Sequence, residues 1–145
     1  MATCLELFET ALRGPLDFTA DESDSADAVR AIWRQSTPEE FALAEQWSRS
    51  EEPRRRAVAM AVLSQFDPAG TGVFRLRCLE MAIVALDDPD PDVSSHAAWA
   101  VMHKQHEDPS RATAVLISLA DHQDPDIRLA AATGLATSEE IGRAH

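Results

Sequence analysis

The chain has 145 residues, about the length of one domain, and 45% of them are apolar while 26% are charged. This balance is typical of a globular protein with a buried core and excludes a wholly disordered or fibrous chain. Acidic residues number 25 against 13 basic ones, a formal net charge of −12, so the protein would repel a nucleic-acid backbone.

The sequence also argues against a membrane or secreted protein. No apolar run approaches the roughly 18 residues that a membrane-spanning helix needs, and Glu6 and Glu9 stand where a signal peptide has basic and then apolar residues. Cys4 and Cys78 are too few to crosslink a chain of this size, and as small apolar side chains they suit a reducing compartment. We therefore expect a cytoplasmic protein with free cysteines that binds neither membrane nor nucleic acid.

Helices dominate the predicted secondary structure. Alanine occurs 25 times, glycine five times and tyrosine not at all, which favours closely packed helices over a sheet. An acidic stretch at 14–25 and a glycine-containing turn at 67–72 are the longer connections. In chain order, the apolar spacing predicts helices over residues 3–13, 26–35, 38–49, 53–66, 73–87, 91–104, 109–121 and 125–137.

Prolines and capping residues mark the starts of five of these helices. A proline is tolerated in the first turn of a helix, where its missing N–H has no partner to lose. Thr37 and Glu40, on either side of the first of these prolines, have the spacing of a capping box. An aspartate immediately precedes three of the other prolines. The prolines are Pro38, Pro53, Pro91, Pro109 and Pro125, and the aspartates are Asp90, Asp108 and Asp124.

An internal repeat underlies this series of helices. Residues 91–101 superpose on residues 125–135 with a shift of 34 residues, and a third copy begins 38 residues before the second, at Pro53. The matching apolar and small positions are Val93 with Ile127, Ala97 with Ala131, Ala98 with Ala132, and Val101 with Leu135. A period in the thirties built of helix pairs predicts an all-α fold, a short right-handed α-solenoid of about four pairs.

The repeats divide the chain into two expected parts. An N-terminal helix and acidic lead-in occupy residues 1–25, and the repeat domain occupies residues 26–145. The second helices of the four pairs are expected near residues 26–35, 53–66, 91–104 and 125–137. Each pair leaves an apolar face that only the next pair can cover.

The last two copies resemble the second-helix signature of HEAT and HEAT-like repeats, a kind of armadillo-like helical fold. The residues that carry the resemblance are Asp-Pro-Asp-Pro-Asp-Val at 88–93 followed by Ala97 and Ala98, and Asp-Pro-Asp-Ile-Arg at 124–128 followed by Ala131, Gly134 and Leu135. In such repeats an aspartate before the apolar anchor and an arginine after it commonly form a ladder between neighbours. The resemblance implies these roles for Asp126, Arg128 and Arg56, whereas Ser94 departs from the arginine position.

The polar set His96, Trp99 and His103 is spaced by three and four residues and so shares one helical face. In a HEAT-like stack the second helix of each pair lines the concave side, which implies that these side chains border a groove. The same columns of the neighbouring copies are mainly apolar: Ala57, Val58, Ala61 and Ser64 before, and Leu129, Ala130 and Thr133 after. We take His96, Trp99, His103 and Leu129 as candidate partner-binding residues. The alternative is that Trp99 packs beneath a neighbouring helix or the chain terminus.

Catalytic and metal-binding patterns are incomplete. His103, His106 and Glu107 could supply metal ligands, but the neighbouring Asp108 is already explained as a helix cap. The HEAT-like enzyme deoxyhypusine hydroxylase binds iron through several His-Glu pairs, and this chain has one. The basic run Arg54–Arg56 opens a helix and is typical of a solvated face or a repeat seam. We therefore expect no catalytic residue, no cofactor and no metal.

These observations favour a protein-interaction or scaffold module that binds a partner polypeptide through the concave face. The alternative is an enzyme or enzyme subunit of a HEAT-like family, either metal-dependent or resembling the phycobilisome lyases, for which the sequence offers no identifiable active site. Because one fold supports many functions, the sequence does not name the partner.

The C-terminal repeat does not have the polar outer face of a terminal cap. Leu129 and Leu135 are apolar, and Thr137 to Glu140 predict another capping-box start, with a further apolar pattern beginning at Ile141. We therefore expect the C-terminal face to be covered, either by a second copy in a homodimer or by a continuing array.

Overall fold

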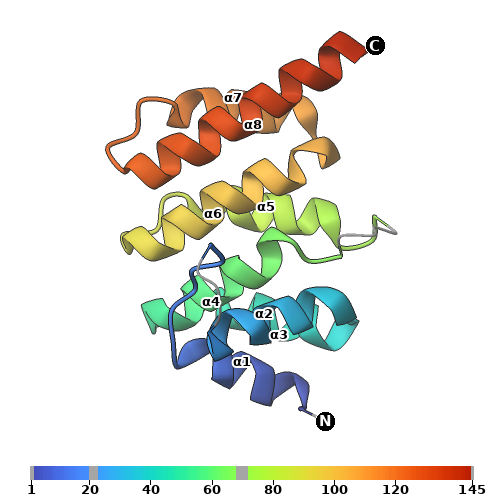
Figure 1. The fold of residues 1–145 in the computed structure, drawn as a ribbon, viewed down its shortest axis with the longest axis vertical. Coiled ribbons are helices and arrows are strands. Elements are labelled where there is room, and N and C mark those ends of the chain that lie inside the picture. Colours follow the sequence, from blue (N-terminus) through green and yellow to red (C-terminus); the bar gives the residue numbers. More distant parts are fainter. Residues whose placement is uncertain (1, 20–22, 68–71, 145) are drawn as a thin grey trace.

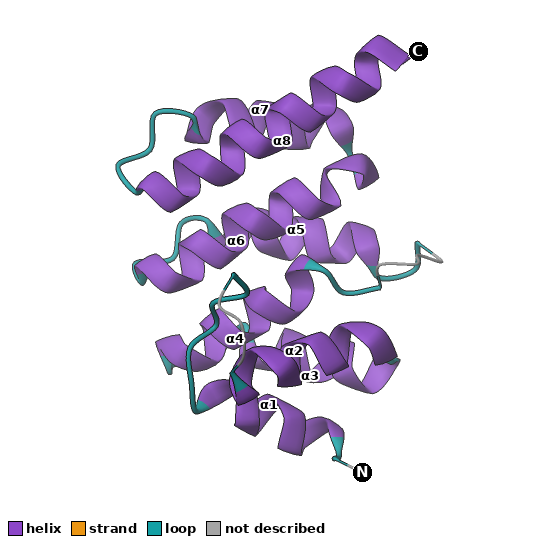
Figure 2. Cartoon of the chain, viewed as in Figure 1, coloured by secondary structure: helices purple, strands orange, loops and turns teal. Residues whose placement is uncertain are grey.

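A computed structural model describes residues 2–19, 23–67 and 72–144, with side chains described as far as residue 138. Within these ranges the chain is all α-helical and has no strand, as predicted (Figures 1 and 2). The helices are α1 (Cys4–Leu12), α2 (Asp24–Gln35), α3 (Pro38–Trp47), α4 (Pro53–Ser64), α5 (Arg75–Ala85), α6 (Pro91–Lys104), α7 (Pro109–Leu119) and α8 (Pro125–Ala144), with a short 3-10 turn η1 (Gln105–Glu107) after α6. Parts of the predicted acidic stretch (20–22) and glycine turn (68–71) lie outside the described residues.

The helices form a stack of pairs. α1 packs on α2, α3 on α4, α5 on α6 and α7 on α8, and α4, α6 and α8 follow one another along the long axis of the molecule. In Figure 1, α6 and α8 lie in front of α5 and α7, so the outer and inner helices of these pairs form separate layers. The predicted short α-solenoid is therefore confirmed.

The predicted helix starts are formed as expected. Thr37 Oγ1 accepts the N–H of Glu40 at 3.2 Å, and the Glu40 carboxylate accepts the N–H of Thr37 at 2.9 Å, which completes the capping box. Asp90 Oδ1 accepts the N–H groups of Asp92 and Val93, and Asp108 Oδ1 accepts that of Arg111. Each of the five prolines opens its helix. These short-range hydrogen bonds explain why the boundaries could be read locally.

Helix α4 lies at the centre of the core. All residues from 57 to 64 are buried, so this helix is covered on every side rather than on one stripe. Five helices cover it from different sides, because α1, α2, α3, α5 and α6 all pack against it. Alanines at positions 57, 59 and 61 allow this close approach, since their side chains add little bulk between helix axes.

Arg56 connects the second helix pair to the third. Its Nε and Nη2 donate to Asp88 Oδ2 and Oδ1 at 2.8 and 3.2 Å, while Nη1 donates to the carbonyls of Ser50 and Glu51. The hydrogen bond to Asp88 raises the pKa of Arg56. Burial alone would raise the pKa of Asp88, but the hydrogen bonds from Arg56 and from the Asp90 N–H outweigh it and lower that pKa. This charge-assisted, bidentate contact holds both residues in place.

The ladder implied by the resemblance is formed only in part. Asp126 accepts hydrogen bonds from Ser95 and Trp99 instead of an arginine. The acidic partner of Arg56 is Asp88, in the turn after α5, and not a residue at the start of α6. Ser94 bonds to carbonyls of its own first turn, so the α6–α8 seam has no arginine rung.

The predicted new helix start near residue 137 is wrong. α8 runs without interruption to Ala144, and the Thr137 hydroxyl donates to the Thr133 carbonyl at 2.9 Å. A threonine inside a helix can bond to the carbonyl four residues earlier, so a capping residue type does not by itself end a helix. The side chains of the apolar pattern expected from Ile141 lie outside the described residues.

Replacing Ile127 by asparagine should lower the free energy of unfolding by about 3 kcal/mol, because an amide would be buried without a partner at a site that is 1% exposed. Ile117→Asn is the matched control, since Ile117 is 60% exposed and should tolerate the change. Urea unfolding followed by circular dichroism measures both values. Similar losses at the two sites would contradict the packing described for the α6–α8 seam.

Replacing Arg56 by alanine should lower the free energy of unfolding by about 2 kcal/mol, because the largely buried Asp88 carboxylate would lose its guanidinium partner. Arg49→Ala serves as control, since the Arg49 side chain is 72% exposed and lies 3.7 Å from Glu45. The control should change stability by less than about 0.5 kcal/mol in the same urea titration at pH 7. Equal effects would mean that the Arg56 contact is worth no more than a surface pair.

Candidate functional site

Trp99 lies at the seam between α6 and α8. Its indole Nε1 donates to Asp126 Oδ2 at 3.1 Å, and the Ser95 hydroxyl donates to the same oxygen. The ring packs beside a buried cluster formed by Ala98, Leu119, Ile127, Ala130 and Ala131 and remains half-buried. The structure thus combines the two sequence-based alternatives, because Trp99 is held by a neighbouring helix and still reaches the surface.

His96 is covered by the chain's own N-terminal strap, which we define as residues 13–19. Figure 1 shows this segment leaving α1 and rising past α4 toward α6. Phe18 of the strap lies edge-on to the His96 ring with centroids 6.4 Å apart, and it also contacts Trp33 at 5.0 Å. Arg30 donates to the Phe18 carbonyl at 3.2 Å and lies over its ring. His96 is therefore partly covered by the strap and does not border an open groove.

Burial changes the acid–base behaviour of both candidate histidines. Desolvation lowers the pKa of His96, opposed by Asp92 and Asp126 and reinforced by Arg54. Desolvation also lowers the pKa of His103, with a smaller contribution from Lys104. Both imidazoles are consequently favoured in the neutral form.

The expected apolar groove does not continue over α4. Ala57, Val58 and Ala61 are at most 1% exposed, and Ser64 is 6% exposed. Trp33 of α2 closes this end, because its Nε1 donates to the carbonyls of Ala61 and Val62 at 3.2 and 2.9 Å. The prediction of a groove along all the second helices is therefore wrong for α4, since α2 folds back onto that surface.

The accessible inner surface lies over α6 and α8. Leu129 of α8 is 55% exposed, and Asp126, which binds Trp99, lies three residues before it on the same side of the helix. Ser95 of α6 faces the same region through its bond to Asp126. Trp99 and Leu129 thus border one surface, whereas His96 is shielded from it.

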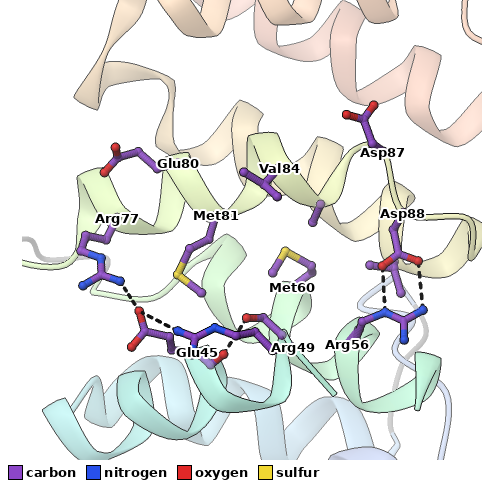
Figure 3. A pocket seen from close by; sticks show the side chains of 13 residues that line it. Glu45, Arg49, Arg56, Met60, Arg77, Glu80, Met81, Val84, Asp87 and Asp88 are labelled. Atoms are coloured by element: carbon purple, nitrogen blue, oxygen red, sulfur yellow. Dashed lines mark hydrogen bonds and ion pairs between the residues drawn. The ribbon is translucent and has the colours of Figure 1, made fainter. Parts of the chain in front are cut away.

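A second concave surface lies in the outer layer, between α3 and α5 (Figure 3). It encloses about 530 Å³ and has an apolar floor that includes Met60 and Met81, with Val84 on its rim. Ion pairs from Glu45 to Arg77 and Arg49 close one end, and the Arg56–Asp88 pair closes the other. The sequence analysis did not find this groove, because it forms where two helices far apart in sequence diverge.

A buried lysine was also missed by the sequence analysis. Lys104, near the end of α6, is 2% exposed, and burial together with the nearby Arg75 lowers its pKa to about 8. Burial raises the pKa of the adjacent Cys78 thiol to about 12. A neutral thiol of this kind is a poor nucleophile, which agrees with its expected role in packing. Both cysteines are free, as expected.

Metal ligands do not gather in the described part of the chain, where no group of three or more histidine, cysteine, aspartate or glutamate side chains could hold an ion. His103 and Glu107, considered above as metal ligands, lie in different surroundings. His103 lies half-buried on α6, while Glu107 accepts a hydrogen bond from Arg75 at 3.1 Å. Among the described residues, no helix combines the length and apolarity needed to cross a membrane.

Comparison with known families agrees with this architecture. Residues 79–143, from α5 to the end of α8, match the family described as HEAT repeats. This segment, a little under half of the chain, is similar to HEAT repeats. No curated protein and no solved structure matches it. HEAT repeats are generally protein-interaction and scaffold modules and are typically non-enzymatic. The matched HEAT segment includes Trp99, His103 and Leu129.

The stability of this protein should fall as the pH drops from about 7.5 to about 5. The unfolded chain takes up protons first, below the ordinary histidine pKa of about 6.5, because folding lowers the pKa of His96 and His103. Replacing both by glutamine should flatten this pH dependence in urea unfolding. His106→Gln is the control, since His106 is exposed. An unchanged pH profile in the double variant would contradict the enclosure of these rings.

Proposed function

We propose that this protein is an interaction module that binds a partner polypeptide through the inner surface of α6 and α8. The observation that supports it most directly is a large exposed aliphatic side chain, Leu129, on a HEAT helix beside a tryptophan held in place. Tryptophan is enriched among residues that dominate binding energy, and such residues work best when their rotamers are already ordered.

The fixed indole gives Trp99 a defined role. Its hydrogen bond to Asp126 and its packing on the α6–α8 seam hold the ring before any partner arrives. A partner would therefore lose little side-chain entropy on the protein's side of the contact. Leu129 supplies the apolar area, and Asp126 supplies an acidic edge that suits a basic or hydrogen-bonding group at the rim.

His96 does not belong to this surface, because Phe18 covers it. His103 stays in the proposal as a neighbouring side chain four residues after Trp99, half-buried and favoured in the neutral form. The protein's location in the cytoplasm remains an expectation from the sequence.

Leu129→Asp should weaken partner binding at least about tenfold while leaving the fold intact, because the side chain is exposed and a carboxylate opposes apolar contact. Quantitative capture with immobilised parent and variant identifies a candidate partner. Titration calorimetry with that purified polypeptide then measures the affinity. Ile117→Asp is the matched control, since Ile117 is a similarly exposed aliphatic residue on α7.

Trp99→Phe provides a second variant that keeps most of the packing and removes the bond to Asp126. It should weaken binding less than Leu129→Asp and leave circular dichroism unchanged. Equal affinity of the parent and both variants for the purified partner would place binding elsewhere on the molecule. An enzymatic activity that both variants reduce, and that needs no bound polypeptide, would support the enzyme alternative instead.

A further inference from the structure

The outer helices of the stack have equivalent positions, as the inner helices do. Five residues lie between the end of each of α3, α5 and α7 and the proline that opens the inner helix after it. Counting back from these prolines aligns Glu45 on α3 with Ile83 on α5, and Ser48 after α3 with Leu86 after α5. The seam between α3 and α5 can therefore be compared, position by position, with the seam between α5 and α7.

At the α5–α7 seam the two positions are apolar and packed. Ile83 and Leu86 lie against a buried cluster formed by residues of α5, α6 and α7. Leu86 also packs against the cluster that contains Ala98, Leu119 and Ile127. These two side chains thus occupy the space over the inner helix at this seam.

At the α3–α5 seam the same two positions are polar. Glu45 and Ser48 line the groove described above together with Met60, Ala85 and Val93, which are the equivalents of the cluster that Leu86 covers one seam further on. We call this groove of about 530 Å³ the outer groove (Figure 3). A cavity of about 150 Å³ already holds a benzene ring, so the outer groove has room for more than one aliphatic side chain.

The floor and the α5 rim of the outer groove suit an apolar occupant. Met60 and Met81 belong to the floor, and methionine adapts to partners of different shape because its side chain is unbranched and polarizable. Val84 on the rim is 74% exposed, the largest fraction among the exposed large apolar side chains of the described residues. Aliphatic side chains that enter between α3 and α5 would contact all three.

The basic side chains that line the outer groove are already paired. The pairs are Arg77 with Glu45, Arg49 with Glu45, and Arg56 with Asp88. The lining as a whole holds four carboxylates against three arginines, so its net charge is negative.

The unpaired charges of the lining are two carboxylates on α5. Glu80 and Asp87 are exposed and lie four residues before and three residues after Val84, so they flank it on one side of the helix (Figure 3). Neither forms an ion pair with a residue in the described part of the chain. Basic side chains on either side of an aliphatic one would match this rim, and the net charge of −12 attracts a basic partner.

We propose that the outer groove binds a basic amphipathic helix of a partner polypeptide. Its aliphatic side chains enter between α3 and α5, in the place that Ile83 and Leu86 take one seam further on, and its lysine or arginine side chains bind Glu80 and Asp87. A helix laid in a groove presents such side chains at intervals of three and four residues, the same intervals as on the α5 rim. The outer groove is separate from the inner surface of α6 and α8, so this inference goes beyond the proposed function and either can fail without the other.

Two synthetic peptides of about 14 residues test the chemistry of the partner. One consists of two leucine–lysine–lysine–leucine–leucine–lysine–leucine repeats, and the other has glutamate in place of each lysine. Fluorescence anisotropy of each labelled peptide is measured against the full chain at about 150 mM salt, where long-range attraction is screened. The lysine peptide should bind with a dissociation constant below about 100 μM, and the glutamate peptide at least about tenfold more weakly.

Ser48→Leu tests the groove itself. A leucine there should fill the space as Leu86 does at the next seam, so the lysine peptide should bind at least about tenfold more weakly, while the thermal unfolding temperature stays the same or rises. Gln46→Leu is the matched control and should leave the affinity unchanged, since Gln46 is exposed on α3 and lies outside the groove lining.

The double variant Glu80→Lys with Asp87→Lys tests the acidic rim and should weaken binding of the lysine peptide at least about tenfold. Glu51→Lys with Asp121→Lys changes the net charge equally at exposed sites outside the groove, so it should weaken binding less than about threefold. Leu129→Asp should leave the affinity unchanged, which separates this inference from the proposed inner surface.

Absence of binding at about 500 μM protein overturns the proposal, as does equal affinity of the parent, Ser48→Leu and the rim double variant. Binding that Leu129→Asp abolishes and Ser48→Leu does not would place the peptide on the inner surface instead. Tighter binding of the glutamate peptide would overturn the basic character of the partner. Self-association of the parent in sedimentation velocity that Ser48→Leu abolishes would make a second copy of the chain the occupant.

Discussion

Close packing around α4 is the constraint on which the stack depends. Residues 57 to 64 of this helix are buried, and α1, α2, α3, α5 and α6 all contact it. Helices can surround another helix in this way only if its side chains are small enough for several neighbours to approach at once, and the alanines at 57, 59 and 61 meet that requirement. The same closure removes α4 from the inner surface. The proposed partner surface therefore lies over α6 and α8, where Leu129 is 55% exposed.

The arginine position in the first turn of the inner helices is used differently from one helix pair to the next. At Arg56 the guanidinium is bound by two carbonyls of its own repeat and by Asp88 of the next, which joins successive pairs. At Ser94 the device is absent, and the α6–α8 seam relies on Asp126, Ser95 and Trp99 instead. The result is that Trp99, the candidate binding residue, is also a structural contact. If the proposed surface binds a partner, binding and the stability of the α6–α8 seam both depend on this one indole.

Local and long-range contacts differ in how far the sequence predicted them. The capping box of Thr37 and Glu40 involves atoms three residues apart, so the pattern alone located it. The strap did not follow from the sequence, because Phe18 is held by Trp33 and His96, which are distant along the chain. The shared helical face of His96, Trp99 and His103 was identified because it depends on local spacing. The contact of Phe18 with His96 was not, because it joins distant parts of the chain. Thr137 shows the limit even of local patterns, since its hydroxyl has a helical carbonyl as an alternative partner.

By itself, the sequence determined the all-α fold, the five proline-marked helix starts and the repeat, because these arise from proline geometry, capping hydrogen bonds and periodic burial within short segments. It also determined which residues are equivalent from one pair to the next. Only the tertiary structure decided which of those equivalent positions are covered. α2 closes the surface of α4, the strap partly covers His96, and Ala132 of α8 is exposed although its equivalents Met60 and Ala98 are buried. Whether a position is buried depends on which segments meet in space. Because the helix pairs share one sequence pattern, that pattern does not show which of them has a neighbour over a given face.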